Sequence, residues 1–304
     1  MKVDRLVLAF DLGGTRIKSG VVDPASGKVL AFETSSVDGD FEAALSGIKR
    51  LGREMTESMT VSAAGICVPG IVDDRGIVVS LPGKLEGIVG YDLPGFLSAE
   101  FGPSFMVMND AVSYAVGESA FGGGAGMSRV VVVTIGTGVG VAVIEEGRPL
   151  GSGTFGAGIF GGQIPISERE EGPKDTSGRS DTIEAMCRAS RIVDYANLAG
   201  GQFETVEEVY AAFERGDGAA RDGVRAYRRH LTRALVALVH AHAPEALVIG
   251  GGPITAGNPL TDGIEEGVNE RLFGSLRVRV SPAGLGDKAA LLGIGHLLAD
   301  RRKA

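Results

Sequence analysis

The sequence LVLAFDLGGTRIKSGVV, residues 6–22, is the stretch around which the chain is organised. It begins with an apolar run over 6–10, whose valine and phenylalanine are typical of a β-strand. Asp11 then interrupts the run with a carboxylate. Gly13-Gly14 allow a tight turn, and a second β-prone run follows over 17–22. The stretch therefore predicts a β-hairpin with an acid at its mouth.

The tip of this hairpin offers several groups to a phosphate chain. They are the backbone N–H groups of Gly13 and Gly14, the hydroxyl of Thr15 and the ammonium group of Lys18. Asp11 can hold a magnesium ion, usually through water, because Mg²⁺ keeps much of its hydration shell. The alternative is an ordinary hairpin with a glycine turn, and Asp-x-Gly-Gly-Thr alone does not decide between the two.

The second half of the chain repeats this design. Residues 129–142, RVVVVTIGTGVGVA, place an apolar β-branched run before Gly136-Thr137-Gly138 and a second run after it. Two such units predict a duplicated domain whose tips face each other. A third glycine turn, Gly250-Gly251-Gly252, follows a short strand at 246–249. These glycines lack the G-x-G-x-x-G spacing, and no G-x-x-x-x-G-K-[ST] loop is present, which excludes the Rossmann and P-loop classes.

Composition and length narrow the class of protein. A chain of 304 residues suits two domains, and 44% hydrophobic with only 6% aromatic residues supports a core of aliphatic side chains. The net charge is −8 and no Lys/Arg-rich run stands out, so we expect no nucleic-acid partner. Cys67 and Cys187 are too few for a disulfide framework or a four-thiolate site. No signal peptide or apolar stretch near the roughly 20 residues of a membrane helix is found, so we expect a cytoplasmic protein without a membrane partner.

Periodicity and capping residues predict the other elements. Strands are expected at 28–34, 61–68, 77–81, 105–108 and 278–280, and helices at 40–55, 110–121, 181–198, 206–215, 219–243 and 287–301. The segment 81–94 is expected to be a loop. Asp110 follows a strand at its carboxyl end, where α/β sheets expose ligands, and it also begins a helix. It is therefore either a functional acid or simply a helix N-cap.

The chain resembles the sugar-kinase branch of the actin-like ATPase superfamily, and within it the ROK (repressor/open-reading-frame/kinase) family. The matching pieces extend nearly from end to end: 11–18, 65–73 (GICVPGIVD), 108–111 (MNDA), 135–140 and 244–252. The resemblance implies an α/β, two-lobed actin-like ATPase (ribonuclease H-like) fold with an interlobe active-site cleft. The expected lobes are 1–121 plus 288–304, for substrate and phosphate binding, and 122–287, for nucleotide binding with helical insertions.

The same resemblance implies ATP-dependent phosphorylation of a hexose or modified hexose, in a glucokinase-like reaction with O6 as the family default. Asp110 would be the general base and Asn109 would hold a sugar hydroxyl. Magnesium would be held by Asp11 through water, because Mg²⁺ keeps much of its hydration shell. A homodimer is also expected. The residues expected to bind ATP are Asp11, Gly13, Gly14, Thr15, Lys18, Gly136, Thr137, Gly138, Gly250, Gly251 and Gly252.

The chain departs from the family pattern on the sugar side. Phe160 stands at the position of the family glutamate, and Gln163 at that of the histidine that contacts sugar and zinc. The family's cysteine motif corresponds to 172–184, GPKDTSGRSDTIE, which has no cysteine, so we predict no structural zinc. Its final acid survives as Glu184, implied to bond sugar hydroxyls but also favoured in a first helical turn. Lys84 replaces a sugar-binding asparagine, as a different contact or as a solvated surface lysine.

These departures leave two further hypotheses open. Loss of the polar contacts at Phe160 and Gln163 is compatible with a non-catalytic sugar or nucleotide sensor. It is also compatible with a kinase for an amino, deoxy or otherwise altered hexose. The N-terminal DNA-binding module of the repressor members is not expected, because the strand at 6–10 begins so soon after Met1.

Overall fold

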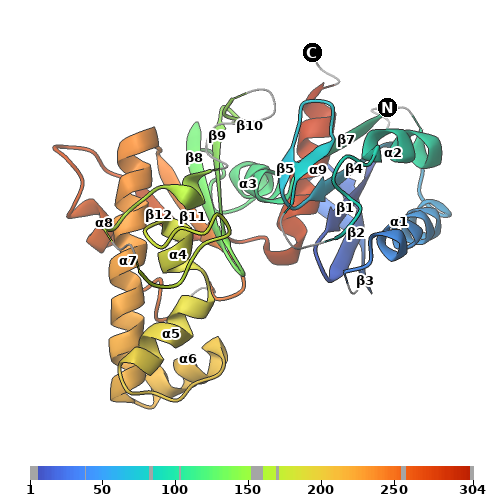
Figure 1. Ribbon diagram of the computed structural model, residues 1–304. Helices are drawn as coiled ribbons and strands as arrows, with labels where there is room; N and C mark the ends of the chain where they lie inside the picture. The colour runs from blue at the N-terminus through green and yellow to red at the C-terminus, as the bar shows by residue number, and fades with distance from the viewer. Residues whose placement is uncertain are drawn as a thin grey trace. The chain divides into compact units, whose positions relative to one another are not determined.

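The computed structural model describes residues 6–37, 39–81, 85–102, 104–151, 160–168, 171–254 and 258–301. These residues form two compact units (Figure 1). The first unit takes in the described residues of 1–126, 147–157 and 285–304, and the second those of 127–146 and 158–284. The first unit is therefore built from three separate parts of the chain: the N-terminal part, a short middle segment and the final helix.

The first unit is built on a five-stranded sheet in the order β3-β2-β1-β4-β7. The strands are β1 (Leu6–Leu12), β2 (Arg16–Asp23), β3 (Lys28–Ser36), β4 (Val61–Val68) and β7 (Phe105–Asn109). The first three form an antiparallel meander, and β1, β4 and β7 are parallel. The predicted hairpin is confirmed. Asp11 does not end the first strand, however, because it lies inside β1 and pairs with Lys18.

Two layers of helices cover the opposite faces of this sheet, because successive side chains of a strand point to opposite sides. Leu8 and Phe10 of β1 pack in one core with α1 (Phe41–Thr56) and α2 (Leu93–Phe101). Val7 and Ala9 pack in the other core with α9 (Ala289–Arg301). Helix α3 (Asp110–Phe121) lies against α9 so closely that a Cβ on Gly293 would overlap the carbonyl group of Ser113.

Smaller elements complete the first unit. The two-stranded hairpin β5 (Ile71–Val72) and β6 (Val78–Ser80) forms a separate small sheet, and η2 (Gly286–Lys288) precedes α9. Strand β10 (Arg148–Pro149) is tied to α9 by an ion pair of 2.7 Å between Arg148 Nη2 and Asp300 Oδ2. Asp40 caps α1 as predicted, with its Oδ1 accepting from the backbone N–H groups of Glu42 and Ala43.

The second unit repeats the strand plan of the first. Its strands are β8 (Arg129–Ile135), β9 (Val139–Glu145), β11 (Ala246–Gly250) and β12 (Arg279–Pro282). They follow the order β9-β8-β11-β12, with an antiparallel hairpin next to two parallel strands. This is the arrangement of β2-β1-β4-β7, so the predicted duplication is confirmed at the level of topology.

The helices of the second unit gather on the long α7 (Gly218–His242), with α5 (Ser190–Leu198) and α6 (Val206–Glu214) beside one end of it (Figure 1). Helix α4 (Ile183–Cys187), α8 (Ile264–Asn269) and η1 (Gly161–Gln163) are short. The single helix predicted over 181–198 is wrong. The backbone is extended at Arg188, which separates α4 from α5, and the N–H group of Ala189 donates to the carbonyl of Gly136 at 2.9 Å.

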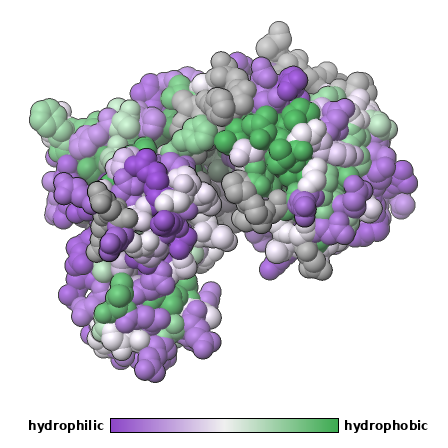
Figure 2. Space-filling model, in the orientation of Figure 1, coloured by the Kyte–Doolittle hydropathy of each residue, from purple (hydrophilic) through white to green (hydrophobic). Residues whose placement is uncertain are grey.

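The visible surface mixes polar and apolar areas (Figure 2). An apolar area covers part of the first unit near β5 in this view, and in that part of the chain Val79 and Val89 are exposed. Within the described residues, no helix combines the length and the apolar character needed to cross a membrane.

The loop predicted over 81–94 is shorter than expected, because α2 already begins at Leu93.

Candidate active site

In the first unit the carboxyl ends of β1, β4 and β7 bring the predicted residues together. The strand register places Asp11 beside Cys67, and Cys67 beside Met108. Asn109 and Asp110 follow directly on β7. The predicted magnesium residue and the predicted base therefore lie at the same end of one sheet, on β1 and directly after β7, with β4 between them. This end is where parallel strands expose ligands.

Asp11 is held by two neighbours. Its Oδ2 lies 3.2 Å from Lys18 Nζ, and its Oδ1 accepts from the thiol of Cys67 at 3.4 Å. Lys18 also pairs with Asp287 at 3.0 Å. Burial lowers the pKa of Lys18, but the charges of Asp11 and Asp287 outweigh this and raise the pKa above its ordinary value. Lys18 therefore remains a cation beside the first glycine tip.

The thiol of Cys67 is a hydrogen-bond donor in this arrangement. The residue is completely buried, and burial, together with the negative charges of Asp11 and Asp110, raises the pKa of Cys67 well above its ordinary value. A thiol that stays protonated is neither a nucleophile nor a metal ligand. Cys187 is similarly buried, and burial raises its pKa to about 12.

Asn109 and Asp110 have separate roles at the start of α3. Asn109 is the N-cap: its Oδ1 accepts from Val112 N at 3.0 Å, and its Nδ2 donates to Gly70 O at 2.8 Å. The alternative that Asp110 is the N-cap is therefore wrong. Asp110 is the first residue of the helix and accepts from Ala111 N at 2.8 Å. A helix N-terminus favours an ionised carboxylate, and only the ionised form can accept a proton.

In the second unit two predicted nucleotide loops meet. The register of β8 and β11 pairs Thr134 with Gly250. Gly251 has a φ of +106°, and a Cβ at this position would overlap the carbonyl oxygen of Ile135. Only glycine permits this approach. The Gly250–Gly252 turn therefore packs directly against the end of β8, from which the tip with Gly136, Thr137 and Gly138 begins.

Glu184 lies immediately behind that tip. Its side chain is buried, with Oε2 accepting from Val139 N at 3.2 Å and Oε1 accepting from Thr176 N at 2.7 Å. A Cβ on Gly138 would lie 2.8 Å from Oε2. The backbone thus occupies both oxygens of Glu184, and its contact with a sugar stays a prediction.

The other predicted sugar-side residues are less closely defined. Gln163 lies in η1 and is partly buried, and Phe160 is 43% exposed. Lys84 lies outside the described residues, so its predicted contact has no structural description.

Thr15 and Thr137, at the two hairpin tips, are both exposed, as phosphate binding requires.

Asp175 is a buried acid that the sequence analysis missed. Its Oδ1 accepts from the N–H and hydroxyl groups of Ser177 and from Arg179 N at 2.7–2.9 Å, and its Oδ2 accepts from the Thr182 hydroxyl at 2.7 Å. Burial alone would raise the pKa of Asp175, but the hydrogen bonds from Ser177, Thr182 and Arg179 outweigh it and lower the pKa. An aspartate followed by serine and glycine is a turn signal, and this signal was available in the sequence.

Metal binding can be tested against the side chains of the first unit. Within the described ranges, no group of three or more His, Cys, Asp or Glu residues is placed to hold a metal ion. Magnesium at a nucleotide needs only one or two carboxylates, because phosphates and waters supply its other ligands. Asp11 therefore fits the magnesium expectation, while the expectation of no zinc stays a prediction.

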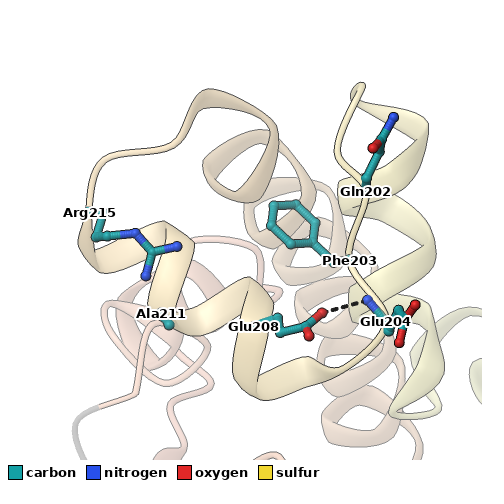
Figure 3. Close-up of a pocket in the computed structure, with 6 residues that line it drawn as sticks. All are labelled: Gln202, Phe203, Glu204, Glu208, Ala211 and Arg215. Atoms are coloured by element: carbon teal, nitrogen blue, oxygen red, sulfur yellow. Dashed lines mark hydrogen bonds between the residues drawn. The ribbon is translucent and has the colours of Figure 1, made fainter.

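A separate hollow lies on the helical part of the second unit (Figure 3). It is lined by Gln202, Phe203, Glu204, Glu208, Ala211 and Arg215. The carboxylate of Glu208 accepts from Glu204 N at 2.7 Å and completes the capping box of α6 with Thr205. Its charge therefore serves the local fold, and none of the predicted site residues lines this hollow.

Comparison with known proteins agrees with this geometry. The ROK family model matches residues 7–301. A beta-glucoside kinase of Listeria monocytogenes is 27% identical over 252 residues, which cover 81% of this chain and 82% of the relative. The crystal structure of a ROK hexokinase from Thermus thermophilus has a TM-score of 0.84 and 25% identity, covering 98% of this chain and 99% of the other.

A second solved structure is a ROK family glucokinase from Streptomyces griseus in complex with glucose and AMPPNP. It has a TM-score of 0.81 and 27% identity, covering 97% of this chain and 99% of the other. Both matches extend over nearly the whole chain. The predicted α/β, two-lobed actin-like ATPase fold is thereby confirmed.

Proposed function

We propose that this chain, which belongs to the ROK family, transfers the γ-phosphoryl group of ATP to a hydroxyl of a hexose or modified hexose. Its relatives include a beta-glucoside kinase and a glucokinase, and the chain is accordingly a carbohydrate kinase. The identity of the sugar, the choice of O6 and the roles of individual residues belong to the proposal.

The position of Asp110 is the observation that supports this proposal most strongly. It stands at the carboxyl end of β7 and at the N-terminus of α3, two strands away from Asp11 in the same sheet. As an ionised carboxylate it would accept the proton of the sugar hydroxyl while the oxygen attacks the γ-phosphorus. Asn109 holds Gly70 at the same edge and would also contact a sugar hydroxyl.

The glycine and threonine tips would bind the phosphates of ATP. Backbone N–H groups and hydroxyls at Gly13–Thr15 and Gly136–Gly138 suit phosphate oxygens, and Gly250–Gly252 would lie against the adenosine. Lys18 would contact phosphate in exchange for one of its two carboxylates. Asp11 would hold magnesium through water, and the ion would neutralise charge on the β- and γ-phosphates.

The sugar side favours an altered hexose. Phe160 in place of a carboxylate suits a less hydroxylated face, such as that of a deoxy sugar, and Gln163 can donate or accept a hydrogen bond. Gln163, Lys84 and Glu184 are the proposed sugar contacts on this side. This preference is a hypothesis about specificity and does not affect the phosphoryl transfer itself.

A coupled assay of ADP release tests the proposed function. Purified protein with ATP and magnesium is mixed with a panel of hexoses, amino hexoses and deoxy hexoses. We expect at least one sugar to raise ADP release well above the rate without sugar. The kinase proposal would be contradicted, and the sensor favoured, if calorimetry detected sugar or nucleotide binding while no sugar of the whole panel stimulated ADP release.

A further inference from the structure

Three buried side chains of the second unit, Asp175, Thr182 and Glu184, form what we name the carboxylate clamp. Asp175 and Thr182 hydrogen-bond each other, and Glu184 bonds to the backbone next to Asp175. Each is at most 6% exposed, and two of them are acids. Buried acids are costly unless hydrogen bonds satisfy them, so their presence here indicates a specific task. The arrangement lies between the loop at 172–182 and the tip at 136–138.

The first part of the clamp fixes the start of α4. The hydroxyl of Thr182 donates to Asp175 Oδ2 at 2.7 Å and accepts from Ala185 N at 3.2 Å as the N-cap of the helix. The oxygen of a hydroxyl that donates to a carboxylate becomes a better acceptor for the next bond. Asp175 therefore orders its own loop and, through Thr182, the short helix to which Glu184 belongs.

The second part of the clamp extends from α4 to the glycine tip. Glu184 accepts from Thr176 N at 2.7 Å, next to Asp175, and from Val139 N at 3.2 Å, next to Gly138. At the other end of the tip, Ala189 N donates to Gly136 O at 2.9 Å. Glu184 within α4 and Ala189 shortly after it thus hold the two ends of the tip.

We propose that the carboxylate clamp is a positioning device for nucleotide binding, in which Asp175, Thr182 and Glu184 fix the Gly136–Gly138 tip in its phosphate-binding conformation. The inference rests on the proposed function, because that function makes this tip a phosphate loop. Hydrogen bonds to ionised acceptors are stronger than neutral ones, and a loop ordered before binding does not lose that entropy when the ligand arrives. The clamp would act on ATP through the tip, whether or not Glu184 also contacts the sugar.

A pair of variants at Thr182 tests the clamp without touching any proposed ligand contact. Thr182 is completely buried, so it has no access to a substrate. Thr182→Val keeps the shape and removes the hydroxyl, whereas Thr182→Ser keeps the hydroxyl. We expect Thr182→Val to raise the KM for ATP and the Kd for ADP by about tenfold, the equivalent of one charge-assisted hydrogen bond, with a sugar KM within about twofold of wild type. Thr182→Ser should remain near wild type in all three values.

Glu184→Gln gives an independent readout, with Asp181→Asn as the matched control. The amide supplies only one acceptor oxygen for the two N–H groups that Glu184 now receives. Asp181 lies in the same segment, but its carboxylate pairs with Arg179 and has no bond to the tip. We expect faster amide hydrogen exchange at Val139 and weaker ADP binding in Glu184→Gln, and neither change in Asp181→Asn.

The outcomes separate this inference from the proposed function, because ADP binding and hydrogen exchange need no sugar. If Thr182→Val and Glu184→Gln bind ADP like wild type and keep slow exchange at Val139, the clamp is overturned while the kinase stands. A rise in the sugar KM of Glu184→Gln with unchanged ADP binding would also overturn it and leave Glu184 as a sugar ligand. If these two variants bind ADP more weakly than wild type but wild type phosphorylates no sugar, the proposed function fails and the clamp stands. Absence of ADP binding by wild type overturns both.

Discussion

Adjacent glycines of the third glycine turn give a sharp test of the nucleotide loops. Gly251 has a φ of +106°, and an added Cβ would overlap the carbonyl oxygen of Ile135 and lie 2.7 Å from both its nitrogen and its carbonyl carbon. These atoms belong to the sheet and have little freedom to move. At Gly252, by contrast, an added Cβ would have no heavy atom of the described residues within 4 Å apart from those of its chain neighbours, and its φ is not positive.

The two alanine variants should therefore differ in stability. For Gly251→Ala, the left-handed backbone costs about 1–2 kcal/mol and overpacking about 1–3 kcal/mol, so the sum is about 2–5 kcal/mol. With roughly 2–4 °C of Tm per kcal/mol in large domains, we expect a Tm lower by roughly 4–20 °C. Gly252→Ala should leave the Tm within about 2 °C of wild type, because its Cβ has space among the described residues and the backbone at Gly252 is not in the left-handed region.

Thermal unfolding followed by circular dichroism, and ADP binding followed by calorimetry, measure the two effects. We expect Gly252→Ala to weaken ADP binding while remaining stable, since its Cβ would fill space that the backbone offers to the nucleotide. A Gly251→Ala variant with the Tm of wild type would refute the packing of this turn against β8. Unchanged ADP affinity in Gly252→Ala would refute the position of the nucleotide.

Other predictions concern the acids of both units. Asp110→Asn should lower kcat by about 10²–10⁴, the usual contribution of a general base, while calorimetry still detects sugar binding; a variant with normal kcat would remove the base assignment. Glu118 is buried and accepts from Gly123 N at 2.9 Å and Leu285 N at 2.8 Å, so Glu118→Gln should lower the free energy of unfolding in urea by about 1–3 kcal/mol, and an unchanged urea midpoint would contradict this. Because the pKa of Asp175 is lower in the folded protein than its ordinary value of 3.8, ionised Asp175 stabilises the fold at any pH above 3.8. This stabilisation is lost as the pH falls through the lower pKa of the folded protein. The Tm advantage of wild type over Asp175→Asn should therefore shrink below pH 3.8, and a constant difference between pH 6 and pH 3 would count against the role of that carboxylate.

The strands and the glycine tips could be predicted because their signals are local. β-Branched runs on either side of glycine and threonine indicate hairpins at residues 6–22 and 129–142, and both hairpins are present. The start of α1 could be placed because Asp40 is a residue that caps helices. The start of α2 was missed although Asp92 and Pro94 form a recognisable helix start.

Features that depend on distant hydrogen bonds could not be predicted in this way. Nothing near Arg188 resembles a helix breaker, and the backbone there turns aside in the segment where Ala189 bonds to Gly136. The same holds for the bonds from Thr176 and Val139 to Glu184, whose acceptor role depends on tertiary packing. Local sequence identified the residue types at the site, while the strand register decided which of them lie together.

Transfer of a labelled γ-phosphoryl group is the measurement that tests the central claim most directly. ATP labelled at the γ-phosphorus is incubated with magnesium and the sugar that gives the highest ADP release, using wild type and Asp110→Asn in parallel. The account predicts that wild type moves the label onto a sugar hydroxyl, detected as a sugar phosphate, and that Asp110→Asn binds the same sugar but forms at least about 100-fold less product in the same time. Label that appears only in inorganic phosphate, or equal sugar phosphate from both proteins, would contradict it.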